Sequence, residues 1–197
     1  MTEPGIERTG ARDEWPSDRE LMARARHGDA AAFELIVRRY WDSLVSYADR
    51  LVGDPDTARD AVQSMFASIW ERRAQWQDEQ AVRTYFYRAV RNRVIDVHRR
   101  TRAWKRWSAR VRVEFRRVSP SPAEVAERAE LAELIESAIR TLPERRREVF
   151  VLAQLQNFSY REVAELLNMA PQTVANHMSL ALRDLRKSLG PHFPTRL

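Results

Sequence analysis

The stretch Ser159–His177 (SYREVAELLNMAPQTVANH) constrains the fold of this chain more than any other segment. Ser159, followed three residues later by Glu162, forms a capping box, which starts a helix. Asn168 tolerates the left-handed backbone that ends a helix, and Pro171 fits the first turn of another helix, where its missing N–H costs nothing. The segment therefore predicts a helix, a short turn and a second helix, which is the layout of a helix-turn-helix.

The second predicted helix has an apolar and a polar side. Its apolar residues recur at helical spacing and are expected to face inward: Val174, Met178, Ala181, Leu182, Leu185 and Leu189. The opposite side carries Gln172, Asn176, Ser179 and Arg183. Short polar side chains early in such a helix read base edges in the major groove of DNA. A plain helical hairpin carries the same local signals and is the alternative.

Composition favours a helical protein in a reducing compartment. The 197 residues suffice for one or two domains. Only 5 residues are Gly, and Cys is absent, which excludes disulfides and thiolate metal sites. No apolar run is long enough to span a membrane, so membrane insertion is not expected. Residues 1–17 lack the apolar core of a secretion signal and are interpreted as a mobile tail.

Basic residues concentrate in one segment. Residues 83–117 contain 13 Lys and Arg against two acids, Asp96 and Glu114, so this segment carries +11; the whole chain carries +6, which leaves −5 for the remainder. A basic stripe on an otherwise acidic protein indicates a surface for a polyanion. Nucleic acid is the favoured ligand. An anionic membrane surface and a solvated helix face are the alternatives.

The hydrophobic pattern predicts an all-α fold with two small helical domains. The first domain spans 18–102 and is expected to hold four helices, at 18–27, from 29 onward, at 57–73, and from 81 past 100. The apolar residues of the third helix follow a regular 3,1,3,1,3,1 spacing, which favours a helix packed on one side.

A linker and a second domain complete the predicted organisation. Residues 103–122 mix aromatic and basic side chains and include the sequence SPSP, so they predict a flexible basic linker. The second domain spans 123–190 and ends in the helix-turn-helix, with 191–197 as a tail. Its helix beginning at Glu144 is expected to turn four side chains inward: Val149, Phe150, Leu152 and Leu155.

Five motifs follow one another along the chain. They are RARHGDAAAF at 24–33; Asp60, Gln63, Phe66 and Trp70 in the spacing D-x-x-Q-x-x-F-x-x-x-W; Tyr85-Phe86 with Arg91-Asn92, Asp96 and Arg99-Arg100; LPERRREVF from Leu142; and the helix-turn-helix. In this order they resemble the bacterial RNA polymerase sigma factors of the sigma-70 family, and more narrowly the extracytoplasmic-function (ECF) group. The resemblance covers Asp18 to about Leu189, in a sigma region 2-like helical bundle and a region 4-like helix-turn-helix.

The resemblance implies that the helix at 57–73 docks on a coiled coil of the polymerase β′ subunit. The candidate contacts flank or oppose the apolar stripe, so they can meet a partner helix while the stripe meets the core. They are Asp60, Gln63, Ser64, Ala67 and Glu71. Phe66 and Trp70 lie on the inner stripe and are interpreted as core residues.

The resemblance also implies that the helix from 81 past 100 lies along the downstream promoter element and helps to melt DNA. Guanidinium groups suit this task because their planar fork binds phosphate and stacks on bases. The loop at 73–80 would capture a flipped base, for which Trp76 offers a flat side chain; a packing role for Trp76 is the alternative. The remaining candidates are Arg91, Asn92, Arg99 and Arg100.

The recognition helix of the helix-turn-helix would enter the major groove at the upstream promoter element. Its candidate contacts are Gln172, Thr173, Asn176, His177, Ser179 and Arg183. The chain departs from the family where Ala170 replaces the usual Ser cap, Ala175 replaces a basic residue, and Leu180 and Leu182 replace Arg. Upstream recognition is therefore expected to depend less on charge and more on direct base reading.

The function predicted from the sequence is that of a sigma factor, which binds core RNA polymerase and directs it to promoters. The expected partners are core polymerase, double-stranded and melted promoter DNA, and an anti-sigma regulator, all in the cytoplasm. A helix-turn-helix regulator that acts without polymerase is the alternative. No catalytic motif or metal-ligand spacing occurs, so no enzymatic activity, metal or cofactor is expected.

Overall fold

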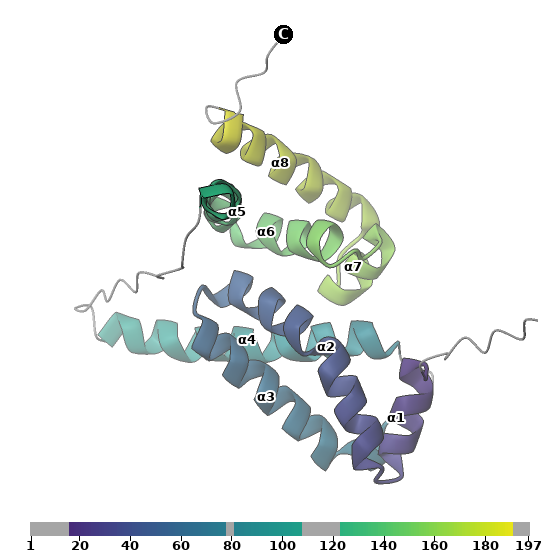
Figure 1. The fold of residues 1–197 in the computed structure, drawn as a ribbon. Coiled ribbons are helices and arrows are strands. Elements are labelled where there is room, and N and C mark those ends of the chain that lie inside the picture. The colour runs from purple at the N-terminus through teal and green to yellow at the C-terminus, as the bar shows by residue number, and fades with distance from the viewer. Residues whose placement is uncertain (1–15, 78–80, 108–122, 191–197) are drawn as a thin grey trace, which may run out of the picture.

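The computed structural model (Figure 1) describes residues 16–77, 81–107 and 123–190, with side chains except at 97–130. Every regular element within these ranges is helical, so the all-α prediction is confirmed. None of the described helices is long and apolar enough to cross a membrane. The predicted tails and most of the predicted linker lie outside the described residues.

Four helices form an N-terminal module. They are α1 (Asp18–Arg26), α2 (Ala30–Val52), α3 (Pro55–Glu71) and α4 (Val82–Trp107). Each of the first three starts at a polar N-cap: Ser17 forms a capping box with Glu20, Asp29 accepts from the backbone N–H of Ala32, and Asp54 from that of Thr57. These caps satisfy amide groups that would otherwise lack partners at the helix starts.

The inner stripe of α3 packs as its spacing predicts. Phe66 is 4% exposed and meets Phe86 of α4 in an edge-on arrangement, with ring centroids 5.5 Å apart. Trp70 is half-buried beside Phe33, at 5.1 Å between centroids. Both residues therefore belong to the packing of the module, in agreement with their interpretation as core residues.

The fourth helix is longer than predicted. Helix α4 continues to Trp107, so residues 103–107 are helical and do not belong to a linker. The sequence contains no Gly or Pro between Ala81 and Ser119, so nothing in this stretch interrupts the helix.

The C-terminal module consists of α5 (Ala123–Thr141), α6 (Glu144–Phe150), a π-helical turn (Val151–Leu155), α7 (Tyr160–Leu167) and α8 (Pro171–Leu189). The π-helical turn inserts one residue into the helical repeat and so shifts which side chains face inward. As a result Leu155 is 37% exposed, against prediction, while the polar residues Glu148 and Gln156 are buried. Periodicity alone did not predict this shift.

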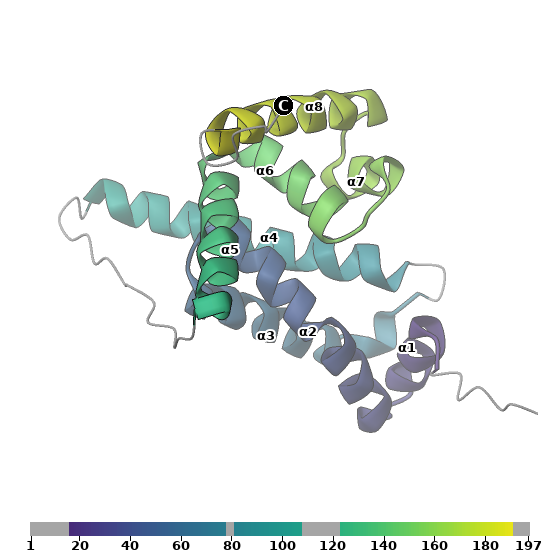
Figure 2. The same ribbon diagram turned by 45° about the horizontal axis from the view of Figure 1, so that its top comes forward.

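The two modules lie against each other. In Figures 1 and 2, α4 and α2 of the N-terminal module run beneath the C-terminal module. Helix α4 contacts α7, and α2 contacts α6 and the π-helical turn. The buried apolar residues of both modules form one continuous cluster. The sequence had predicted two helical modules but not this junction between them.

Candidate nucleic-acid and polymerase interface

The helix-turn-helix owes its geometry to local interactions that the sequence predicts. The hydroxyl of Ser159 accepts from the backbone N–H of Glu162 at 3.3 Å, and the Glu162 carboxylate accepts from the Ser159 backbone N–H at 2.8 Å. These bonds lower the pKa of Glu162 below its usual value, the hydroxyl contact most and the backbone contact next. Asn168 ends α7 with φ 52° and ψ 58°, the left-handed conformation expected of it.

Burial of α7 and α8 against each other orients the recognition helix. Helix α7 buries Val163, Ala164, Leu166 and Leu167, and α8 buries Val174, Met178, Ala181 and Leu185. Leu182 and Leu189 are half-buried. Because this apolar stripe faces the module, the opposite side of α8 faces solvent.

The predicted base-reading row is exposed along α8. Gln172, Asn176, Ser179 and Arg183 lie on its solvent-facing side, as does Thr173. The Gln172 side-chain amide donates to Asn176 Oδ1 at 3.2 Å, so the two amides are held next to each other. His177 is half-buried, and its Nδ1 is buried without a hydrogen-bond partner among the described residues. The start of α8 lacks a side-chain cap because its N-cap residue is Ala170.

Charge on α8 is confined to its second half. The Arg183 side chain is 69% exposed, and its Nε lies 3.7 Å from the carboxylate of Asp184, which also pairs with Arg146 of α6 at 2.5 Å. Arg186 and Lys187 are exposed in the last turn. The first turns therefore present amides and hydroxyls, and the later turns present cations.

The predicted polymerase-docking residues share one exposed face of α3. Asp60, Gln63, Ser64, Ala67 and Glu71 are all exposed, while the opposite side of the helix is buried in the module. Arg93 of α4 reaches across and donates to the backbone carbonyl of Ser64 at 3.2 Å. The face thus remains open for a partner helix.

The candidate residues on α4 are placed less uniformly. Asn92 is exposed, and the side chains of Arg99 and Arg100 lie outside the described residues. Arg91 is largely buried because its guanidinium pairs with Glu148 of α6 at 2.5 Å, with side chains 13% and 5% exposed. Burial opposes the charge of Arg91, but the hydrogen bond and charge of Glu148 raise its pKa above the usual value. Sequence reasoning missed this partner, which is 57 residues away.

Trp76 is a packing residue in this structure. It follows a short 3-10 turn, Arg73–Gln75, is 7% exposed, and meets the Tyr85 ring edge-on at 5.0 Å between centroids. Its side chain is therefore covered by α4 rather than displayed on the surface. The packing alternative describes its present position, and a direct role with DNA stays a prediction.

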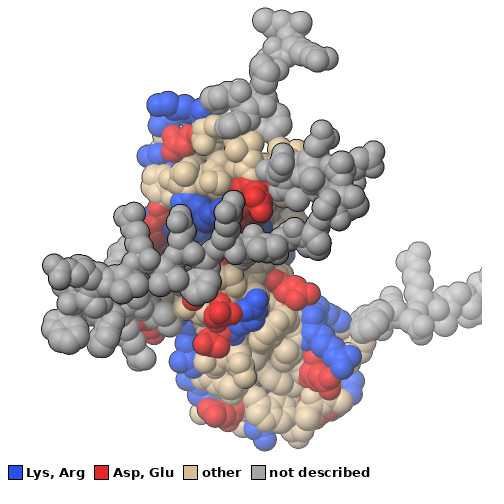
Figure 3. Space-filling view, turned by 60° about the vertical axis from the view of Figure 1, so that its left-hand side comes forward, with Lys and Arg blue, Asp and Glu red and all other residues tan. Residues whose placement is uncertain are grey.

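Surface charge is mixed where the structure describes it. Figure 3 shows Lys and Arg interspersed with Asp and Glu over both modules on the face in view. No group of three or more His, Asp or Glu suited to hold a metal ion occurs among the described residues. The chemistry available at these surfaces is hydrogen bonding and ion pairing with macromolecular partners.

Comparison with known proteins agrees with this geometry. The family model for sigma-70 region 2 matches residues 36–105, and that for sigma-70 region 4 matches residues 132–185. The RNA polymerase sigma-E factor of Streptomyces coelicolor is 30% identical over 163 residues, covering 82% of this chain and 88% of the relative. The ECF RNA polymerase sigma factor SigM of Mycobacterium tuberculosis is 28% identical over 174 residues, covering 88% and 85%.

A solved structure shares the whole arrangement of elements. CnrH, determined in complex with the cytosolic domain of CnrY, matches with a TM-score of 0.67 and 26% identity, over 88% of this chain and 97% of CnrH. The chain belongs to the sigma-70 family of bacterial RNA polymerase sigma factors, within the extracytoplasmic-function group. This is not a family of enzymes.

Proposed function

We propose that this sigma factor directs core RNA polymerase to promoters by contacting two DNA elements with its two modules and by promoting melting of the DNA between them and the start site. The observation that carries the proposal is the exposed polar row on α8, held outward by a buried stripe on the same helix. Such a row fits the major groove, where base edges offer hydrogen-bond donors and acceptors.

Upstream recognition is assigned to the first three turns of α8. Gln172 and Asn176 carry amides that pair with adenine, Thr173 and Ser179 offer hydroxyls, and His177 lies beside them. Arg183, with Arg186 and Lys187, is positioned to hold the phosphate backbone. Amide reading ahead of charge is what the replacement of basic residues by Ala175 and Leu180 leads us to expect.

Polymerase docking is assigned to the exposed face of α3. The face joins two acids, Asp60 and Glu71, to the small or polar residues Gln63, Ser64 and Ala67. Small residues let a partner helix approach closely, and the flanking acids favour a basic partner. Because the apolar stripe of α3 is already buried, this contact does not compete with the core of the module.

Downstream recognition and melting are assigned to α4. Asn92 is exposed, and Arg99 and Arg100 follow on the same basic helix, where they would hold the phosphates or bases of the separated strand. Stacking of a flipped base on Trp76 requires its contact with Tyr85 to rearrange. Arg91 reaches DNA only after it leaves Glu148.

An anti-sigma partner belongs to the same proposal. The related sigma factor CnrH was determined in complex with the cytosolic domain of CnrY. We infer that this chain is likewise regulated by a protein that covers its polymerase or DNA surfaces. Since polymerase and chromosomal DNA are its main partners, we place its action in the cytoplasm.

The deciding experiment is transcription in vitro with purified core polymerase and a library of promoters. The proposal expects specific start sites that appear only when the chain and core are both present. Specific duplex binding by the chain without polymerase, and no directed start site, would instead support an ordinary helix-turn-helix regulator.

One charge reversal separates docking from folding. Asp60→Arg is expected to weaken binding to core polymerase at least tenfold, because it places a cation where we expect a basic partner. Glu34→Arg reverses a charge on the exposed side of α2, away from the docking face, and serves as the matched control. Equal core binding by the two variants, measured by fluorescence anisotropy, would reject the assignment of α3.

A further inference from the structure

The junction between the modules contains a buried ion pair with a full set of partners. Glu148 of α6 is 4% exposed. Its carboxylate accepts from Arg91 Nε at 2.5 Å, from the Tyr47 hydroxyl at 3.4 Å and from Arg145 at 3.3 Å. Burial raises the pKa of the Tyr47 phenol, and the charge of Glu148 adds to this, so the phenol stays a donor. A carboxylate so placed is stable only while Arg91 faces it.

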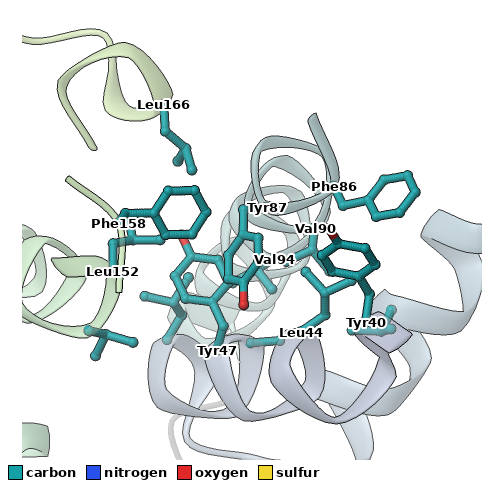
Figure 4. Packing of buried hydrophobic residues seen from close by; sticks show 14 of the residues in the cluster. Tyr40, Leu44, Tyr47, Phe86, Tyr87, Val90, Val94, Leu152, Phe158 and Leu166 are labelled. Carbon is teal, nitrogen blue, oxygen red and sulfur yellow. The ribbon is translucent and has the colours of Figure 1, made fainter. Parts of the chain in front are cut away.

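A second cluster joins α4 to the turn before α7 (Figure 4). The Tyr87 hydroxyl donates to Gln156 Oε1 at 2.5 Å, and the Tyr87 ring meets that of Phe158 edge-on at 4.9 Å. The Arg83 guanidinium donates to the Gln156 carbonyl and lies 3.9 Å from the centre of the Phe158 ring. The π-helical turn and the left-handed Asn157, with φ 53°, present Gln156 and Phe158 to α4.

Two more exposed contacts flank these clusters. Arg50 of α2 pairs with Glu136 of α5 at 2.5 Å. Arg88 of α4 donates to the backbone carbonyl of Glu165 at 3.2 Å. Among the described residues, the buried polar or charged side chains are Thr84, Glu148 and Gln156, so two of the three lie at this junction. Paired polar groups of this kind specify one docked arrangement, because sliding or partial opening leaves them unpaired.

The junction occupies cations of α4 and leaves the docking face of α3 free. Arg83, Arg88 and Arg91 all belong to the basic segment, and all three are bonded to the C-terminal module. The docking residues Asp60 and Gln63 are exposed in the same structure. The closed chain therefore presents its polymerase surface while part of its DNA surface is covered.

We propose that the junction is an autoinhibitory contact: the C-terminal module holds the α4 cations away from DNA until docking on core polymerase separates the modules. This inference rests on the proposed function of α4 as a DNA surface. The chain between Trp107 and Ala123 can span roughly 50 Å when extended, so covalent connection does not prevent separation. An open fraction of one in ten or less lowers the apparent DNA affinity at least about tenfold.

The absence of cysteine allows a direct test by crosslinking. Arg50→Cys and Glu136→Cys introduce one thiol on each side of the junction, at positions outside the proposed DNA and docking surfaces. A flexible bismaleimide with a reducible disulfide joins them in the closed state. The matched control carries Glu34→Cys and Arg38→Cys, which form an ion pair within α2.

The crosslinked chain is expected to bind core polymerase but to fall at least about tenfold in promoter-directed transcription, with recovery on adding reductant. The control crosslink should leave transcription unchanged. Transcription by the crosslinked chain equal to that after reduction would overturn the proposal, and failure to bind core would overturn the assignment of the block to DNA. Failure of the reduced chain to transcribe would reject the proposed function instead.

A charge swap tests the junction without crosslinks. Arg50→Glu faces Glu136 with a like charge and should open the modules, whereas Arg50→Glu combined with Glu136→Arg should close them again. Dyes on Glu34→Cys and Ser188→Cys, one in each module, report the separation by energy transfer. We expect low transfer and about tenfold tighter promoter binding by the polymerase complex for the single variant only. Low transfer in the unmodified free chain, or no rescue by the swap, would refute the autoinhibitory contact.

Discussion

Asn176 offers the sharpest test of how this protein reads DNA. Its side chain lies on the solvent-facing side of α8, and its Oδ1 accepts one hydrogen bond, at 3.2 Å, from Gln172. The amide NH₂ and the second lone pair of Oδ1 remain available. Adenine presents an acceptor at N7 and a donor at N6 in the major groove, so Asn176 can bind it with two hydrogen bonds. The change Asn176→Ala removes both bonds and leaves the helix surface intact.

The expected effect follows from those two bonds. A bidentate pair discriminates by about 1–3 kcal/mol, which is roughly 5- to 150-fold in relative affinity. Folding should not suffer, because a side chain on the helix surface leaves no cavity and Ala favours helix more than Asn by a few tenths of a kcal/mol. The weakening should therefore fall on the upstream sequence with adenine at one position and leave other sequences nearly unchanged.

The measurement is binding of the polymerase complex to upstream elements that differ at single positions. Arg183→Ala serves as the comparison, since removal of a phosphate-binding side chain weakens all sequences alike and lowers the salt slope by about one unit. Adding Gln172→Ala to Asn176→Ala should cost less than the sum of the single changes, because the two amides touch. An equal weakening on every sequence would reassign Asn176 to the DNA backbone and refute the reasoning.

Three further outcomes are expected. Reversing the charges of Arg99 and Arg100 should reduce the slope of log affinity against log salt by close to one unit for each phosphate that the protein no longer binds, and an unchanged slope would argue against α4 as a DNA surface. Ser159→Ala should cost about 1 kcal/mol and lower the Tm by about 2–4 °C in calorimetry, while an unchanged Tm would mean the cap contributes nothing. The lowered pKa of Glu162 implies stability that is present above its ordinary value of 4.5 and disappears as pH falls through the folded-state value. Glu162→Gln should remove this part of the Tm decline between pH 7 and pH 3, and a parallel decline in both chains would contradict it.

Much of the candidate DNA surface could be predicted because its determinants are local. The Ser159–Glu162 box, the left-handed Asn168 and the spacing of apolar residues on α8 each act over a few residues along the chain. The same holds for α3, where periodicity alone separates the docking face from the buried stripe. Helix periodicity and capping depend on near neighbours, so one sequence suffices to read them.

Local signals did less well where the helix changes its repeat or continues without a stop. Leu155 was expected to face inward, but the π-helical turn carries it outward and buries Gln156 instead. The helix α4 passes the expected boundary at 102 and reaches Trp107. In both places the sequence contains residues compatible with either outcome, and packing against the rest of the module selects one.

The amino-acid sequence by itself determined the helical class, the helix-turn-helix and the side of each recognition helix that faces outward, because these follow from interactions between residues close in the chain. Only the tertiary structure decided that Arg91 meets Glu148 and that Trp76 is covered by Tyr85. The first of these contacts joins residues 57 positions apart. Such pairs depend on how whole helices pack, and no local pattern of charge or hydrophobicity records which partner a side chain will find across the junction between modules.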